Sequence, residues 1–384
     1  MQEYFNPDVT DEVIAEKYPA LMKETEKFDS PETREQLLER GFNPDNIVRY
    51  CYRPMDMRWL YWESEADLLD REGPNFFPQV FDGNEFLFTT EQTRKTPGPP
   101  LNTSNLLDIN SMDSGALGFP KYIDRSYADD GLFSELGGNG NEVTPNLSEA
   151  ADTYLKVAGS GVEELFYHAI AILHSPIYRQ ENEGALQQDW PRVPLPEDSE
   201  VLRQSARLGE EVASLIDVEQ DVPGVDSGEE IRKELRPLGR PEHADPNESL
   251  DPNSDFGVTA GWGYIGHHGA TMPKGGEYEP GSYTPEEKAK LPEQAWELWG
   301  QQTLNIYLNE NARWANVPER VWNYRLGGYR VVKKWLSYRE EDILGRDLRI
   351  CEVQHVKHMV RRIAALLLLE PRLDTNYEAV KAAS

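Results

Sequence analysis

Residues 161–178 read GVEELFYHAIAILHSPIY, and this stretch determines the first element of the fold. Its apolar side chains recur every three to four residues, which predicts an amphipathic helix. The helix should end before Pro176, because proline disfavours a helical backbone in the residue that precedes it. The same period predicts a helix over residues 202–215. It also predicts a helix over residues 349–369, which should end before Pro371.

Segments that favour strands surround these helices. Residues 46–62 are rich in aromatic and β-branched residues and are interrupted at Pro54, which predicts two short strands around an irregular turn. Residues 303–308 alternate like a strand, and residues 91–150 resemble loops between short strands. Capped helices are expected in residues 8–41. The sequence therefore predicts an α+β fold with short strands, several helices and a long C-terminal amphipathic helix.

The chain has 384 residues, more than one compact core usually organises. We expect a division at residue 150, with helices, strands and loops in residues 1–150 and a helical and mixed part in residues 151–384. Residues 196–256 carry 17 acidic and 6 basic residues, which predicts a solvated connector or surface excursion. A glycine-rich insert follows at residues 257–283.

The charge of the chain is strongly negative and unevenly distributed. Asp and Glu number 68 against 39 Lys and Arg, for a net charge of −29, and such a surface should repel DNA and anionic membranes. Residues 311–384 are the exception, with 14 basic and 9 acidic residues, so a site for a polyanion is expected near the C-terminus. An acidic surface with only 14 lysines suits a salt-rich cytoplasm, and halophily is our hypothesis for the charge. A function that repels anions is the alternative.

The expected cellular location rests on membrane and secretion signals that the sequence does not contain. The longest apolar run is far shorter than the roughly 20 residues needed to cross a bilayer, and no secretory signal pattern is visible. Two cysteines, Cys51 and Cys351, cannot form a disulfide framework. We therefore expect a cytoplasmic protein with no membrane partner.

Sequence motifs for catalysis are absent: neither a phosphate-binding loop nor a serine-hydrolase elbow occurs. Cys351, His355 and His358 are spaced i, i+4 and i+7, so they share one helical face and form a weak zinc candidate. A buried cysteine with two hydrogen-bonded histidines explains the spacing equally well. A metal-dependent enzyme centred on these three residues stays an alternative.

Residues 325–339 (RLGGYRVVKKWLSYR) interleave cations with aromatic residues around a glycine turn. Arginine and lysine in such a place can reach phosphates or base edges, and aromatic rings can stack on bases. The alternative is an ordinary solvated face. We take as DNA-binding candidates Arg325, Tyr329, Arg330, Lys333, Lys334 and Arg339, with a second cluster of the same chemistry at Arg53, Arg58, Arg94 and Lys95.

Four blocks, in this order, carry a resemblance to a known family. The first (YRPMDMRWLYW) resembles the Y-R-P-F-D-x-R-W-x-Y signature that follows the catalytic domain in large adenine-specific DNA methyltransferases. As a set, the blocks are most similar to single-chain type ISP restriction-modification enzymes, over roughly residues 1–372. They are residues 52–62, 166–179, 189–195 and 321–336.

The resemblance implies a target recognition (DNA specificity) domain: a non-catalytic module that positions double-stranded DNA for an adenine-N6 methyltransferase on another segment or chain, in restriction-modification or phage defence. S-adenosylmethionine would bind that catalytic domain, and a helicase or nuclease domain is a further implied partner. The Asn/Asp-Pro-Pro-aromatic loop that adenine methylation requires does not occur here, so we expect no catalytic residue in this chain. An acidic protein-interaction or DNA-mimic protein, which would have no basic cleft, is the alternative.

Overall fold

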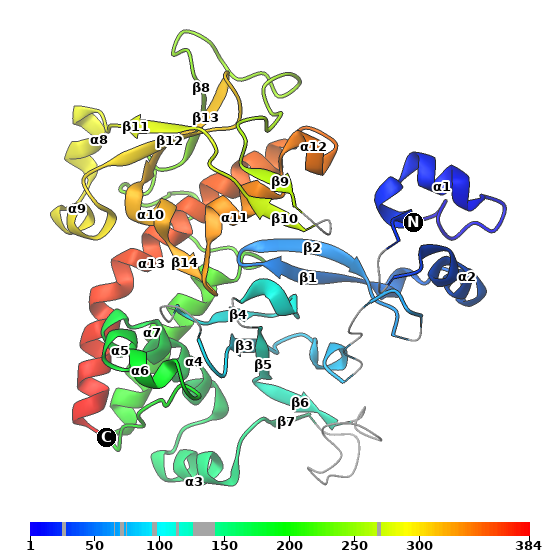
Figure 1. The fold of residues 1–384 in the computed structure, drawn as a ribbon. Helices are drawn as coiled ribbons and strands as arrows, with labels where there is room; N and C mark the ends of the chain where they lie inside the picture. The colour runs from blue at the N-terminus through cyan, green and yellow to red at the C-terminus, as the bar shows by residue number, and fades with distance from the viewer. Residues whose placement is uncertain are drawn as a thin grey trace. The chain divides into compact units, whose positions relative to one another are not determined.

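The computed structural model describes residues 1–24, 28–64, 66–69, 73, 75–93, 98–112, 115–125, 143–266 and 270–384 (Figure 1). The chain forms two compact units from interleaved segments. The first unit consists of Met1–Tyr50, Met57–Asn84 and Tyr122–Thr144, and the second of Cys51–Asp56, Glu85–Lys121 and Pro145–Ser384. From the sequence we expect one division at residue 150, whereas these units exchange segments several times along the chain.

The helices predicted at the start of the first unit are present, and of the two α2 has a side-chain cap whereas α1 has none. Helix α2 starts where the side chain of Asp29 accepts the N–H of Glu32 at 3.1 Å, and it ends at Gly41, whose φ of 77° favours glycine. The remaining elements of this unit are α1 (Asp11–Lys17), α2 (Ser30–Arg40), most of β1 (Ile47–Arg53) and β2 (Asp56–Tyr61), β6 (Tyr122–Asp124), most of β7 (Val143–Pro145), and 3₁₀ turns at Pro19–Met22, Pro44–Asn46 and Phe77–Gln79.

Strands β1 and β2 form the predicted hairpin around Pro54. Met55 occupies the turn with a φ of 60°, a left-handed conformation that is unusual for a residue with a side chain. The tip of the hairpin, Cys51–Asp56, belongs to the second unit. There Cys51 bridges to Leu107 in a parallel arrangement.

Short sheets organise the second unit, and every strand pair within it whose register is described is antiparallel. The largest has the order β11-β12-β13-β8, and a three-stranded sheet has the order β4-β3-β5. Two hairpins, β9–β10 and β14–β15, complete the set. The strands are β3 (Phe86–Thr89), β4 (Leu101–Thr103), β5 (Leu117–Pro120), β8 (Arg240–His243), β9 (Gly263–Ile265), β10 (Thr271–Pro273), β11 (Tyr278–Gly281), β12 (Thr303–Tyr307), β13 (Ala312–Pro318), β14 (Arg325–Leu326) and β15 (Tyr329–Arg330).

Helices α4, α7 and α13 pack together in the second unit, with α13 running along the other two (Figure 1). These three confirm the helices predicted from apolar periodicity, and the α+β class is confirmed with them. The helices of this unit are α3 (Glu149–Ala158), α4 (Val162–His174), α5 (Pro176–Glu181), α6 (Glu183–Leu186), α7 (Ser199–Ile216), α8 (Pro285–Lys290), α9 (Glu293–Trp299), α10 (Glu319–Asn323), α11 (Val331–Ser337), α12 (Glu341–Leu344) and α13 (Ile350–Ala382), with a 3₁₀ turn at Ile109–Ser111. Among the described residues, none of the helices is long and apolar enough to span a bilayer.

The predicted end of the last helix before Pro371 is wrong, because α13 continues through this proline to Ala382. The extra turns are held by packing: Tyr377 and Val380 join a buried cluster with Ile172 and Leu173 of α4. Proline removes one backbone donor from a helix, but the burial of large apolar side chains beyond it stabilises the helix by more than that loss.

The acidic stretch 196–256 is exposed in part, as at residues 245–249 and 251–254, and buried in part. Val225, Leu235 and Leu238 are buried. Arg362 of α13 forms a buried ion pair with Asp226 and donates to the carbonyl oxygens of Ser214 and Asp217 at 2.8 and 3.0 Å. These carbonyls lie at the C-terminal end of α7, so a guanidinium satisfies the free acceptors of that helix end.

Candidate nucleic-acid interface

Hairpin β14–β15 presents the first of the predicted residues. Its turn is the pair Gly327 and Gly328, with φ of 57° and 92°, as the glycine-glycine sequence predicts. A β-carbon on Gly327 would lie 2.6 Å from the carbonyl oxygen of Ser111, so close packing also requires glycine there. Leu326 is fully buried and anchors the hairpin to the unit.

Arg325 and Arg330 lie directly opposite each other in the hairpin register. Opposite residues of an antiparallel pair share one face of the ribbon, and two like charges there repel each other. Arg325 donates to the carbonyl oxygen of Gly328 at 2.8 Å, while the Nε of Arg330 is buried without a hydrogen-bond partner among the described residues. Within the same residues, neither arginine has a carboxylate within 4.0 Å. The pair is therefore an uncompensated positive site on a strongly acidic chain.

Helix α11 adds two lysines next to this pair. Lys333 is half-buried, and burial followed by the charge of Arg330 lowers its pKa. Lys334 is buried, with its ammonium 5.2 Å from the ring centroid of Tyr329 and 4.8 Å from that of Tyr338. Burial and then the charge of Arg53 lower the pKa of Lys334 to about 8. At neutral pH Lys334 is still mostly charged, and the rings hold it in place by cation–π attraction.

Arg339 and Arg53, two further predicted residues, are held in buried ion pairs. Arg339 makes a bidentate contact with Asp56, at 2.6 and 3.2 Å, and stacks on the ring of Trp335. Arg53 donates to Asp108 at 2.9 Å and stacks on Tyr52. Both guanidinium groups are largely enclosed. Their position suits the support of the β1–β2 hairpin tip better than contact with a nucleic acid.

Asp56 is the residue that sequence reasoning missed at this site. It belongs to the same YRPMDMRW block as Arg53, and Arg339 lies 283 positions away. The backbone of Met55 is held as well, because its carbonyl oxygen is 2.8 Å from the Nε2 of His355. The block therefore ties the hairpin tip to the C-terminal segment. An aspartate next to a buried turn residue was the only signal available in the sequence.

The remaining predicted residues lie elsewhere. Arg58 is half-buried on β2, in the part of that strand assigned to the first unit. In the same unit, Trp59 is exposed and stacks with Arg49, whose guanidinium carbon is 4.7 Å from the ring centroid. Arg94 and Lys95 lie outside the described residues.

The weak metal candidate on α13 does not have the arrangement of a metal site. Cys351 is exposed, whereas the Nε2 of His355 is already engaged by Met55. Burial lowers the pKa of His355, and that of His358 to about 4. Among the described residues, no group of three or more His, Cys, Asp or Glu side chains could hold a metal ion.

Comparisons with known proteins identify the architecture. A comparison with curated proteins gives no match. Three solved structures are similar over most of this chain: a DrdV–DNA complex (TM-score 0.54, 16% identity, 90% of this chain), the ATP-dependent Type ISP restriction-modification enzyme LlaBIII bound to DNA (0.54, 14%, 98%), and a nuclease-deletion mutant of the Type ISP enzyme LlaGI with a DNA substrate mimic (0.50, 14%, 97%). At these identities the likeness concerns the fold.

These structures contain much longer chains, of which the present chain covers 30%, 21% and 30% respectively. The family comparison is more specific. The model described as the Type ISP C-terminal specificity domain matches residues 3–364, which is nearly the whole chain. The chain therefore belongs to the family of Type ISP C-terminal specificity domains.

Proposed function

We propose that this chain is the non-catalytic DNA target-recognition module of a restriction-modification enzyme. Membership of the specificity-domain family supports the proposal. The three similar structures support it as well, since each is described as a complex with DNA or with a DNA substrate mimic. Neither finding says which residues meet the DNA.

The observation that carries the proposal is the arginine pair of β14–β15. Other arginines of the second unit, such as Arg320 and Arg372, have a carboxylate partner at 2.9 Å. Arg325 and Arg330 face each other, and among the described residues neither has a carboxylate partner. The repulsion between their two positive charges costs free energy unless an anion binds between or beside them. Phosphate groups of DNA, or the O6 and N7 acceptors of guanine, are the anionic or acceptor groups that arginine binds best.

Each candidate has a distinct place in this proposal. Arg325, Arg330 and Lys333 contact phosphates or base edges, and Tyr329 pairs with Leu326 at the next position of the hairpin. Lys334 contributes its charge from a buried position, where its ammonium lies near the rings of Tyr329 and Tyr338. Arg53 and Arg339 hold the hairpin tip of β1–β2 through Asp108 and Asp56.

A binding titration over a range of salt concentrations tests the proposal. The variants are Arg325→Ala and Arg330→Ala, and the control is Arg372→Ala, which removes an exposed arginine that is paired with Glu211. Each lost phosphate contact should weaken duplex binding and reduce the slope of log K against log[salt] by about 0.9. If neither hairpin variant differs from the control in affinity or slope, the hairpin does not bind DNA.

The finer description of the enzyme is also a proposal. We infer that the module serves an adenine-N6 DNA methyltransferase that binds S-adenosylmethionine on another domain or chain. A helicase or nuclease domain or subunit is a further partner, and the enzyme acts in defence against phage DNA in the cytoplasm. The similarity to much longer chains supports a multidomain setting. Affinity purification from the native host should recover an Asn/Asp-Pro-Pro-aromatic methyltransferase sequence on the same or a bound polypeptide. Recovery of the chain with no such sequence would contradict this description.

A further inference from the structure

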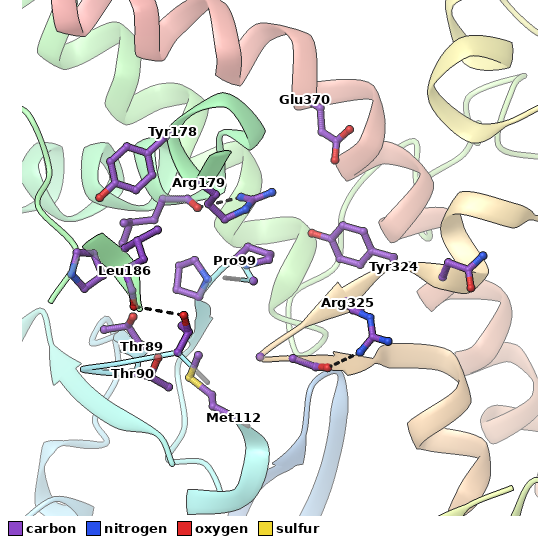
Figure 2. Close-up of a pocket in the computed structure, with 18 of the residues that line it drawn as sticks. Thr89, Thr90, Pro99, Met112, Tyr178, Arg179, Leu186, Tyr324, Arg325 and Glu370 are labelled. Atoms are coloured by element: carbon purple, nitrogen blue, oxygen red, sulfur yellow. Dashed lines mark hydrogen bonds between the residues drawn. The ribbon is translucent and has the colours of Figure 1, made fainter. Parts of the chain in front are cut away.

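A cavity of about 660 Å³ lies inside the second unit, next to the β14–β15 hairpin (Figure 2). Its volume falls within the range typical of small-molecule sites. The wall is built from segments that are distant in the sequence: strand β3 and the residues after it, the start of α5, helix α10, the hairpin and α13. Arg325, Gly327 and Gly328 belong both to the hairpin and to this wall, so the cavity adjoins the proposed DNA site.

Three polar side chains enter this cavity from different elements. Figure 2 shows Arg179 of α5, Tyr324 after α10 and Glu370 of α13 converging on the same space. They interact electrostatically, since the charge of Arg179 lowers the pKa of both Tyr324 and Glu370 against the larger upward effect of burial. Together they offer hydrogen-bond donors and acceptors along one edge of the cavity.

Arg179 is the least satisfied of the three. One of its nitrogens donates to the carbonyl oxygen of Leu173 at 3.0 Å, and this is its single hydrogen bond among the described residues. Within those residues no carboxylate lies within 4.0 Å of its guanidinium, and burial lowers its pKa. A guanidinium has five donors in a planar fork. Most of these donors are therefore available to a ligand in the cavity.

Other polar side chains also line the cavity: Thr89, Thr90, Thr93, Glu319, Arg320 and Asn323. The remaining wall is apolar and suits a flat ring. It includes Pro99, Pro100, Met112, Leu173 and Leu186. These apolar residues give a free phosphate ion nothing to bind. A purely apolar ligand would leave the unused donors of Arg179 desolvated without a partner, whereas Glu370 already pairs with Arg320 at 2.9 Å. A heteroaromatic ring with hydrogen-bonding edges satisfies both sides of the cavity.

We propose that this cavity binds a nucleobase with its sugar. The guanidinium of Arg179 donates to a ring nitrogen or carbonyl of the base, the carboxyl group of Glu370 accepts from an exocyclic amine, and Arg325 reaches the attached phosphate from the hairpin. Two sources supply this chemistry: a nucleotide extruded from the bound duplex, or a free nucleotide. Binding of an extruded nucleotide rests on the proposed function, whereas binding of a free nucleotide does not.

The test uses a variant that fills the cavity without touching the cationic pair. Asn323 is exposed, lies at the end of α10 and lines the cavity, so Asn323→Trp should occupy the space with little effect on folding. Gln180→Trp is the matched control, because Gln180 is exposed on α5 and does not line the cavity. Unfolding curves of both variants establish that the fold is intact.

Two ligands separate the two sources. For an extruded nucleotide, the unmodified chain should bind a duplex with one unpaired nucleotide on the order of tenfold more tightly than the fully paired duplex, since the cost of unpairing is already met. Asn323→Trp should abolish this preference and keep the affinity for paired DNA. For a free nucleotide, calorimetry with each of the four deoxynucleoside monophosphates should show binding that Asn323→Trp abolishes and Gln180→Trp retains.

The two proposals fail in different ways. If paired DNA binds with its salt dependence intact, but no ligand responds to Asn323→Trp, the cavity proposal is overturned and the proposed function stands. If no duplex binds the chain but a monophosphate does so in a manner that depends on Asn323, the proposed function fails and the nucleobase site stands.

Discussion

Replacing Arg339 by methionine removes the guanidinium that holds Asp56 and keeps a long apolar side chain against Trp335. In the folded chain both partners are enclosed, with 7% of Arg339 and 1% of Asp56 exposed. Removing one partner of such a pair typically costs about 3–5 kcal/mol of unfolding free energy, because a buried charge is left behind. The lost stacking on Trp335 adds at most about 2 kcal/mol. For a unit of this size the loss of the ion pair alone should lower the melting temperature by roughly 6–20 °C.

Thermal unfolding followed by tryptophan fluorescence measures this loss, and Arg372→Met serves as an exposed control. Adding Asp56→Asn to Arg339→Met should recover part of the stability, because the uncompensated carboxylate is then neutral. Below the melting temperature, the salt dependence of DNA binding should be unchanged in Arg339→Met. A melting temperature equal to that of the control, together with a salt slope reduced by about 0.9, would make Arg339 a phosphate contact and refute its assignment as a support.

Four further outcomes follow from the structure. The pKa of Lys334 is lowered from 10.5 to about 8, so the folded chain releases this proton at a lower pH than the unfolded chain does. Between pH 8 and 10.5 the folding stability should therefore rise relative to that of Lys334→Met. DNA affinity should fall over the same range, and titrations at a series of pH values measure both. Arg362→Met should lower the unfolding free energy by about 3–5 kcal/mol in urea titrations, because Asp226 and the end of α7 lose their partner. Gly327→Ala should weaken DNA binding, measured by anisotropy, since its β-carbon would lie 2.6 Å from the oxygen of Ser111. If the net charge of −29 reflects halophily, the melting temperature should rise steadily as KCl is added.

Local sequence signals were sufficient for much of the fold. The apolar period within residues 161–174, with Ser175 and Pro176 after it, predicted α4 and its end, and the glycine pair predicted the β14–β15 turn. These features depend on residues close together in the chain. The end of α13 could not be predicted in this way, because Tyr377 and Val380 pack against α4 and the residues next to it rather than against their own neighbours in sequence.

The candidate site was predicted only in part for the same reason. Charge and aromatic spacing singled out residues 325–339, but they could not tell a free guanidinium from a paired one. Whether Arg339 is paired depends on Asp56, which is 283 residues away, and no local pattern reports that contact. The acidic stretch 196–256 shows the same limit, since Asp226 counts as surface charge until Arg362 is placed beside it. The cavity lined by Arg179, Tyr324 and Glu370 depends on the same kind of distant contact.

Photocrosslinking tests the central claim, that the β14–β15 hairpin and α11 face the DNA. Iodouracil-substituted duplex DNA reacts with nearby aromatic side chains, and Tyr329 lies on the hairpin between the two arginines in sequence. After irradiation, digestion and mass spectrometry, we expect the main crosslink on Tyr329, and we expect it to decrease in the Arg325→Ala/Arg330→Ala double variant. Crosslinks confined to other segments, with Tyr329 unmodified, would contradict the account.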